Sequence, residues 1–491
     1  MKNAVVVGAG FGGLALAIRL QSAGIDTMIL EARDRPGGRA YMWEKDGFTF
    51  DAGPTVITDP ACLADLWALS GHAMEDDVDL LPVMPFYRLN WPDGTNFDYS
   101  NGEAALRAAI AALNPGDVAG YERFLAYSAA VYEQGYVKLG AVPFLDFRSM
   151  LKAVPALARQ RAWRSVYATV ASYIENEKLR EALSFHTLLV GGNPMATSAI
   201  YALIHKLEKD GGVWFARGGT NRLIAGMARH FERLGGVLRL NDPVARISTS
   251  DDRVSKVTTR GGFELRPDAV ACNADVLHSY RDLLDHPSAA RSTRRLERKK
   301  WSPSLFVLHL GIQGEFPEIP HHMILFGPRY RGLLDDIFKK GVLAEDFSLY
   351  LHHPSASDPS LAPPGHSTFY ALAPVPHLGD APLDWTVEAP RLTKRIIAEI
   401  EKRLIPDLGA RIVTQFSYAP PDFAADLGAH HGSAFSLLPS LMQSAYFRTH
   451  NRDDVIGNLY FVGAGTHPGA GIPGVVASAK ATASLMLGQG A

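Results

Sequence analysis

A glycine-rich turn near the start of the sequence has the residues needed to hold a dinucleotide. Residues 8–13 match the pattern G-x-G-x-x-G, with glycines at Gly8, Gly10 and Gly13. In this pattern the first glycine permits a tight turn, the second lets the backbone approach a pyrophosphate, and the third lets a helix pack closely on a strand. Glu31 follows 18 residues after Gly13, where its carboxylate can accept hydrogen bonds from ribose hydroxyls. An acid here favours an unphosphorylated ribose, so we do not expect NADP as the tightly held cofactor.

A second pair of glycines, followed by an arginine, comes directly after this acid. The segment from Ala32 to Ala40 contains Arg33, the glycine pair that ends at Gly38, and Arg39. The glycines allow close approach of a ligand to the backbone, and the arginine can neutralise a pyrophosphate. The longer flavin cofactor FAD needs such a second contact, whereas a nicotinamide cofactor does not. We therefore expect FAD, with a surface turn carrying a solvated arginine as the alternative.

A glycine-rich loop near the other end of the sequence is the third such feature. It spans residues 463–474 and follows an apolar run that is typical of a strand over 458–462. Ordering so many glycines costs much conformational entropy, so we expect the loop to serve a function. The N-terminus of the small-residue helix that follows can stabilise negative charge on a reduced flavin ring. Thr466 and His467 are candidates for lining that ring, and a structural role in the loop is the alternative.

The elements that must position these motifs are short strands and the helices that follow them. Apolar runs predict parallel strands over 4–7 and 27–30, with a helix over 14–20 between them, as in a Rossmann-like α/β unit. The residues expected to hold the cofactor are Gly8, Gly10, Phe11, Gly12, Gly13, Glu31, Ala32, Arg33, Gly38, Arg39, Ala40, Gly463, Ala464, Gly465, Ile472, Gly474 and Val475.

Composition excludes several other classes of protein. A length of 491 residues predicts two or three packed units. The net charge of −2 gives no general attraction to nucleic acid. Two cysteines make no disulfide framework, which suits a cytoplasm, and the first predicted strand begins too early for a signal peptide. The two longest uncharged stretches, 182–205 and 455–479, are interrupted by glycine and proline, so we expect no transmembrane span.

Taken together, these motifs resemble those of the carotenoid desaturases in the FAD-containing amine-oxidase-like superfamily, and in particular the bacterial, lycopene-forming phytoene desaturases. The resemblance runs from end to end, and the ending at 463–475 is its most specific part. Further matching segments are 48–55, 189–194, 217–220 and 273–275. By the same resemblance, Val244 is the residue that contacts the adenine side of the cofactor through its backbone.

The resemblance implies a reaction and the molecules that take part in it. It implies FAD-dependent desaturation of 15-cis-phytoene to all-trans-lycopene in successive steps of hydride abstraction, each with loss of a proton from the neighbouring carbon. The C40 substrate is drawn from a membrane, and oxygen or a quinone reoxidises the flavin. No catalytic base is identifiable in the sequence. There is also no Ser-His-Asp set, zinc-spaced Cys/His cluster or P-loop, so we expect no metal.

The domain organisation is predicted to be discontinuous. An FAD-binding domain is expected from residues 1–83, 217–290 and 455–491, and a mixed-sheet substrate domain from 84–110 and 291–454. Residues 111–216 are expected to form a helical lid that faces a membrane, because 144–167 combine apolar and basic side chains. An ordinary solvated lid is the alternative, and the basic run 291–300 is a second candidate surface. The expected location is cytoplasmic, at the inner face of the cell membrane.

Two other functions stay open at this stage. One is a related flavin enzyme, such as a desaturase or isomerase for another carotene, or an amine oxidase. The other is a non-enzymatic escort protein for prenylated lipids, built on the same scaffold without flavin. Such an escort needs no intact set of cofactor motifs, and all three motifs are present here.

Overall fold

Apolar runs from three distant parts of the chain pair into one parallel sheet. In the computed structural model, which describes residues 1–488, its strand order is β20-β13-β1-β2-β9, and neighbouring strands run parallel. The strands are β1 (Asn3–Val7), β2 (Asp26–Leu30), β9 (Val237–Arg239), β13 (Ala269–Cys272) and β20 (Leu459–Phe461). A parallel sheet is normally covered on both faces, which suits strands that are apolar throughout.

Alternation of side chains along β1 separates the two faces of this sheet. Ala4 and Val6 lie in a core with the helices α1 (Phe11–Ser22), α9 (Thr220–Arg233) and α16 (Ile472–Met486). Val5 and Val7 pack on the opposite face, against a four-stranded sheet. That sheet contains β10 (Val244–Ser250), β11 (Arg253–Thr259), β12 (Glu264–Leu265) and β14 (Leu284–Asp285).

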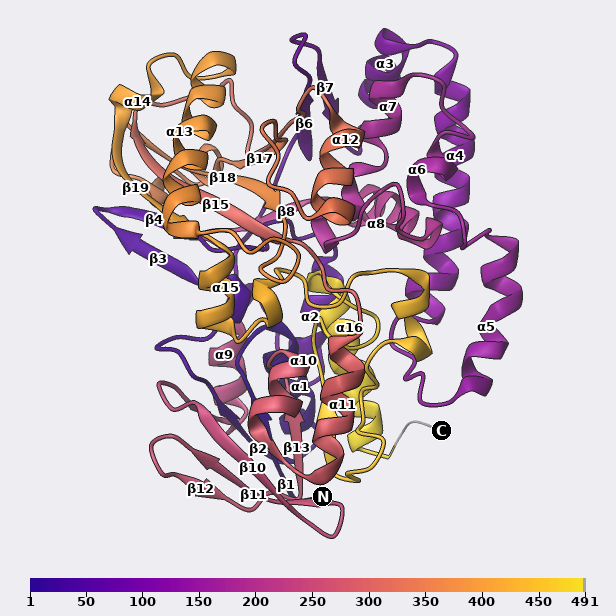
Figure 1. The fold of residues 1–491 in the computed structure, drawn as a ribbon, viewed down its shortest axis with the longest axis vertical. Helices are drawn as coiled ribbons and strands as arrows, with labels where there is room; N and C mark the ends of the chain where they lie inside the picture. The colour runs from indigo at the N-terminus through magenta and orange to yellow at the C-terminus, as the bar shows by residue number, and fades with distance from the viewer. Residues whose placement is uncertain (489–491) are drawn as a thin grey trace.

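A seven-stranded mixed sheet forms the second region, at the upper left of Figure 1. Its order is β19-β15-β18-β17-β16-β6-β7, antiparallel except where β16 meets β6. The strands are β6 (Tyr87–Asn90), β7 (Asn96–Tyr99), β15 (Ser304–Gln313), β16 (His322–Leu325), β17 (Leu349–His352), β18 (His366–Val375) and β19 (Ile412–Tyr418). Alternate residues of β15 again divide the faces: Phe306 and Leu308 pack on α13 (Trp385–Arg403) and α14 (Leu408–Arg411). Leu305 and Val307 face the helical region.

The helical region lies beside this sheet, on the right of Figure 1. It contains α3 (Glu103–Leu113), α4 (Asp117–Tyr132), α5 (Phe147–Arg159), α6 (Val166–Val170), α7 (Glu177–Ala182) and α8 (Leu203–Gly211). Its segment 144–167, predicted as one amphipathic unit, is divided: α5 ends at Arg159, Arg161 adopts a positive φ of 50°, and the Ser165 side chain caps α6.

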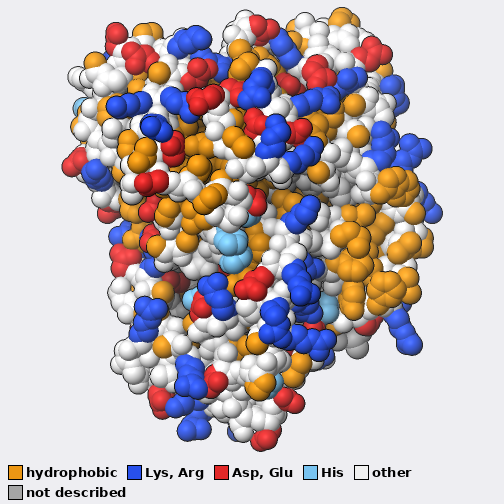
Figure 2. Space-filling view, in the orientation of Figure 1, with side chains coloured by type: hydrophobic (Ala, Val, Ile, Leu, Met, Phe, Trp, Pro, Cys, Tyr) orange, Lys and Arg blue, Asp and Glu red, His pale blue; other side chains and the backbone are white. Residues whose placement is uncertain are grey.

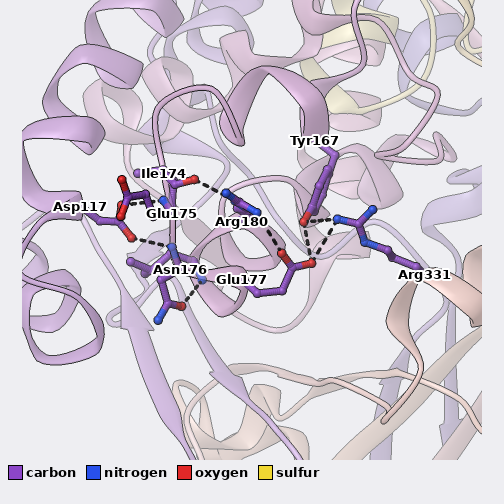
Figure 3. Close-up of polar contacts among 9 residues, drawn as sticks. Asp117, Tyr167, Ile174, Glu175, Asn176, Glu177, Arg180 and Arg331 are labelled. Carbon is purple, nitrogen blue, oxygen red and sulfur yellow. Dashed lines mark hydrogen bonds and ion pairs between the residues drawn. The ribbon is translucent and has the colours of Figure 1, made fainter.

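Polar contacts join the helical region to α12 (Tyr330–Asp335), next to the mixed sheet (Figure 3). Glu177 accepts a 2.6 Å hydrogen bond from the Tyr167 hydroxyl, and Arg331 donates to both of these side chains. Asp117 accepts from the backbone N–H groups of the two residues before Glu177, which fixes the turn into α7. Arg331 and Glu177 are about half exposed, so this ion pair adds little stability. The contact between α12 and the helical region is held mainly by apolar packing, in which Tyr330 and Leu334 take part.

Shorter elements complete the described chain. They are α2 (Pro60–Ala68), the hairpin β3 (Met42–Lys45) and β4 (Phe48–Asp51), the pair β5 (Leu80–Pro82) and β8 (Trp214–Ala216), α10 (Val276–His278), α11 (Pro287–Glu297) and α15 (Pro420–Leu427). Within residues 1–488, no helix has both the length and the apolar character needed to cross a membrane.

Candidate active site

One cavity of about 950 Å³ is lined by all three regions. Its first end lies beyond the carboxyl ends of β1 and β2, where ligands bind in open α/β sheets. Its other walls are apolar side chains from the mixed sheet and from the helical region. The cavity therefore joins a backbone-rich end to a hydrocarbon-lined end.

The predicted N-terminal turn forms the backbone-rich end. Gly8 has a φ of +97°, which favours glycine, and α1 begins at Phe11, inside the motif. A Cβ atom on Gly13 would lie 2.0 Å from the Gly8 carbonyl oxygen, and one on Gly12 would lie 2.7 Å from Asn273 Oδ1. Gly8, Gly10, Phe11 and Gly12 line the cavity, whereas Gly13 is used for helix packing behind it. The first N–H groups of α1 have no carbonyl partner within the helix and can bind phosphate oxygens.

Glu31 stands at the end of β2, as the spacing predicts. Its side chain is buried, and its two oxygens accept hydrogen bonds from the backbone N–H groups of Ala9, at 2.7 Å, and Arg33, at 3.0 Å. These contacts fix the carboxylate at the cavity surface, and each oxygen keeps a lone pair for a ribose hydroxyl. Ala32 and Val244 line the same end of the cavity.

Arg39 lies at the cavity with its side chain partly buried. Its Nε donates to the Ala434 carbonyl at 2.6 Å, and one terminal nitrogen is 3.4 Å from the Ser433 carbonyl. Burial lowers the pKa of this guanidinium and the nearby carboxylate of Asp275 opposes that shift, so the group stays charged at neutral pH. Its remaining N–H groups are available to a pyrophosphate, and Gly38 and Ala40 line the cavity beside it.

The C-terminal loop meets the N-terminal turn across one side chain, Asn273. A Cβ atom on Gly463, where φ is +102°, would lie 2.6 Å from Asn273 Oδ1, the same atom that Gly12 approaches. The two glycine motifs, some 450 residues apart in the sequence, thus pack against one amide oxygen and against each other, since a Cβ atom on Gly12 would also lie 3.1 Å from Gly463 Cα. The predicted residues of the loop that line the cavity are Gly463, Ala464, Ile472, Gly474 and Val475, the last three at the start of α16.

Two residues of the loop lie elsewhere than the sequence suggests. Thr466 does not line the cavity, because its hydroxyl donates to the Gly463 carbonyl at 2.9 Å and shares a 2.7 Å hydrogen bond with Ser478. It therefore fastens the loop to α16 and is not a flavin-face residue in this structure. Gly465 also faces away, toward Val276.

His467 does line the cavity. Its Nε2 is 2.9 Å from the Leu139 carbonyl and so carries the proton, while Nδ1 is buried and has no partner among the described residues. Burial lowers the pKa of His467 to about 4. The ring is therefore neutral at physiological pH and is a weak base.

Arg448 is a supporting residue that sequence reasoning missed. Its buried guanidinium donates to four backbone carbonyls, two of them at Ala464 and Thr466 within the loop. The loop thus gains a rigid backing that places its inner edge on the cavity. No local pattern around Arg448 indicated this, since its two partners in the loop come from a later segment of the chain.

The far end of the cavity is made of hydrocarbon. Phe185, Leu189, Ile324, Phe326, Leu372 and Phe423 are among its lining side chains. Helix α5 contributes Met150, Ala153 and Leu157 from its inner face. Glu208 is a polar exception: it is fully buried at this wall, with the Tyr87 hydroxyl donating to it at 2.7 Å and His186 Nε2 3.1 Å away.

The residues at the backbone-rich end fit FAD. Two helix N-termini, those of α1 and α16, meet there across glycines whose Cβ atoms would collide with the backbone or with Asn273. Glu31 supplies ribose acceptors and Arg39 supplies positive charge. The hydrocarbon-lined end matches a long apolar molecule, because it offers few polar groups to a hydrophilic one.

Comparisons with known proteins agree with this chemistry. Residues 11–487 match the protein family described as "Flavin containing amine oxidoreductase". The chain is 61% identical over 487 residues to a lycopene-forming phytoene desaturase of Paracoccus sp., covering 99% of this chain and 97% of that protein. It is 58% identical over 488 residues to the lycopene-forming phytoene desaturase of Pantoea ananas, covering 99% of both. A solved oxidoreductase from Methanosarcina mazei shares the fold, with a TM-score of 0.66 at 17% identity over 97% of this chain and 98% of that one.

Proposed function

The chain belongs to the flavin-containing amine oxidoreductase family, and we propose that it is an FAD-dependent desaturase that converts 15-cis-phytoene to all-trans-lycopene. The observation that carries this proposal is an identity near 60% along almost the whole chain to lycopene-forming phytoene desaturases. The single cavity that joins a flavin-type end to a hydrocarbon-lined end supports it independently.

The residues of the chain hold and align the reactants. Bound FAD supplies the hydride acceptor. The glycine turns, Glu31 and Arg39 fix its dinucleotide part, and the start of α16 places a positive helix end at the cavity. The hydrocarbon-lined walls keep a polyene extended and exclude water. Water would otherwise add to the cation that hydride loss leaves on the substrate.

The proton lost from the neighbouring carbon needs an acceptor. Two polar side chains at the cavity wall, His467 and Glu208, are candidates. His467 is neutral, but its pKa near 4 makes it a weak base. Glu208 lies at the wall of the hydrocarbon-lined end, where the Tyr87 hydroxyl donates to its carboxyl group.

We also propose that the protein binds to a membrane surface through α5. The inner face of this helix lines the cavity, while Phe147, Leu151 and Val154 on its outer face are 51%, 53% and 45% exposed. Figure 2 shows an apolar surface on the right, over α5. Trp163, Val137 and Met442 are further exposed apolar side chains. Lysine and arginine side chains gather over α11 on the same face. Such a surface suits an anionic bilayer, where the hydrocarbon substrate is dissolved.

Two further points belong to the proposal. The electron acceptor is oxygen or a membrane quinone. Helix α5 lines the cavity and carries exposed apolar side chains on its outer face, which favours an acceptor from the membrane. The escort alternative fits less well, because a protein that only carries a prenylated lipid has no need of glycines packed closely around a second cofactor.

The decisive experiment is expression of the chain in a host that accumulates phytoene, with identification of the carotenoids by chromatography. We expect lycopene. As a matched control, Gly13→Val places a side chain against the Gly8 carbonyl and should abolish flavin binding and conversion together. If phytoene stays unconverted although the protein is yellow and contains flavin, the proposed substrate is wrong and the flavin assignment stands. If conversion stops at a carotene before lycopene, the proposed product is wrong.

A further inference from the structure

Three buried histidines meet behind the wall of the cavity. His322 begins β16, His352 ends β17, and the register of the mixed sheet pairs them directly. His321 precedes His322. One ring nitrogen from each lies within 4.8 Å of the nitrogens of the other two, and the side chains are 4%, 0% and 0% exposed for His321, His322 and His352. No motif in the sequence predicted this group, because His352 comes from another strand than the one that His321 and His322 begin.

Hydrogen bonds orient two of the rings and leave nitrogens without partners. His322 Nδ1 is 2.7 Å from the Tyr350 hydroxyl, and His321 Nδ1 is 2.7 Å from the Ser357 hydroxyl. In both rings the Nε2 atom has no partner among residues 1–488, and the same holds for both ring nitrogens of His352. Buried polar atoms are normally paired. The Nε2 atoms of His321 and His322 and the Nδ1 atom of His352 therefore call for a ligand, whereas His352 Nε2 has Asp51 Oδ2 at 3.5 Å.

Ring stacking alone does not account for these nitrogens. The planes of His322 and His352 lie 20° apart with ring centroids 5.6 Å apart, while His321 is turned by 74° and 63° relative to them. Stacking uses the faces of the rings and gives nothing to lone pairs in the ring plane. A ligand that accepts electron pairs from three nitrogens at once satisfies the whole group.

We propose that His321, His322 and His352 bind one divalent metal ion of the zinc class. Three neutral imidazoles suit zinc and its transition-metal neighbours, whereas magnesium and calcium require oxygen ligands. Nitrogens around a tetrahedral zinc lie roughly 3.4 Å apart, so the rings need to close by no more than about 1.4 Å from the 4.8 Å limit. Asp51 Oδ2, 3.5 Å from His352 Nε2, is placed to hold that ring in the way that carboxylates orient metal-binding histidines.

The ion would have a structural and positioning role. It would tie β16 to β17 and, through Asp51 at the end of β4, to the segment that carries Thr55. His322 bonds to Tyr350, which lines the cavity, so the site would also fix that tyrosine. This inference does not depend on which carotene the protein converts.

The test is the metal content of the flavin-containing full chain, produced in zinc-supplemented medium and passed over a chelating resin. We expect about one zinc per chain by mass spectrometry. In His352→Gln we expect less than about a tenth of that, because a three-histidine site loses most of its affinity for zinc when one ligand is removed. His353→Gln is the matched control, since His353 is the adjacent buried histidine, bonds to the Ile319 carbonyl and lies outside the group. Flavin absorbance reports whether each variant has folded.

A second measurement covers a variant that does not fold. The zinc X-ray absorption spectrum of the wild-type protein should show three imidazole nitrogens bound to the metal. Protein produced in medium with cobalt in place of zinc should show the visible absorption bands of a tetrahedral cobalt ion. A wild-type chain with full flavin and no zinc or cobalt would overturn the proposal. Zinc that persists unchanged in folded His352→Gln would also overturn it.

Discussion

At the scale of single residues, one side chain links the two ends of the cofactor site. Asn273 follows β13, and its amide is approached by Gly12 from the N-terminal turn and by Gly463 from the C-terminal loop. A side chain at either glycine would meet the Asn273 oxygen at less than 3 Å. The two motifs were predicted separately from the sequence, but their dependence on a common contact is a property of the folded chain.

His467 gives a prediction at this scale. We expect His467→Gln to keep kcat within about threefold of the wild-type value, because the pKa of His467 near 4 makes it a poor base and the glutamine amide can still donate to the Leu139 carbonyl. The measurement is turnover of phytoene supplied in liposomes. A loss of about a hundredfold or more, the usual size of a general base effect, would identify the ring as a catalytic group.

At the scale of elements, α5 is used on both of its faces. Its inner residues close the cavity. Its outer residues Leu151 and Val154 are about half exposed, as is Phe147, whose ring packs edge-on against Tyr446. A helix with this division of side chains can deliver a ligand from the surface that it contacts to the cavity that it lines. Pro155 within the helix removes one backbone hydrogen bond and permits a local distortion there.

The corresponding prediction concerns binding to vesicles. We expect Leu151→Asp combined with Trp163→Ser to weaken binding to anionic phospholipid vesicles by about a hundredfold or more, since each lost apolar anchor is worth about 1.5–3 kcal/mol and the two together about 3–6 kcal/mol. Sedimentation with the vesicles measures it. Val413→Ser on β19 is the matched control, because Val413 is equally exposed at 54% but lies on another element. Unchanged binding of the double variant, with flavin retained, would exclude α5 as the docking surface.

At the scale of the whole molecule, the packing places several histidines where they cannot readily take up a proton. Burial lowers the pKa of His309 to about 3 and that of His467 to about 4. The unfolded chain binds these protons below pH 6.5, whereas the folded chain does not, so folding becomes less favourable as the pH falls. Between pH 6.5 and about pH 4, each of these two histidines lowers the free energy of unfolding by on the order of 3 kcal/mol.

We therefore expect the thermal unfolding midpoint to be nearly constant above pH 7 and to fall steadily between pH 6.5 and 4. Tryptophan fluorescence of the flavin-containing protein follows the transition. His309→Phe keeps the stacking on Phe416 and removes one titrating group, so its midpoint should depend less steeply on pH in the same range. A slope equal to that of the wild type would show that His309 does not contribute.

The sequence predicted local units better than contacts between them. The strand and turn around Gly8 are where the pattern places them. Helix α1 begins at Phe11 and not at Leu14, because Gly12 and Gly13 of the motif adopt helical backbone. Thr466 could not be placed, since its direction depends on Ser478 in the next helix. The histidine group was also beyond prediction, because it depends on the register between β16 and β17.

The two-faced α5 also determines how the rate of such an enzyme must be described. If substrate enters across this helix from a bilayer, the relevant concentration is the mole fraction of carotene in the lipid, and dilution of the aqueous phase leaves the rate per bound enzyme unchanged. Adding empty lipid would slow the reaction at a fixed amount of substrate. The hydrocarbon product leaves into the same lipid phase, so it accumulates beside the entrance and competes there with fresh substrate.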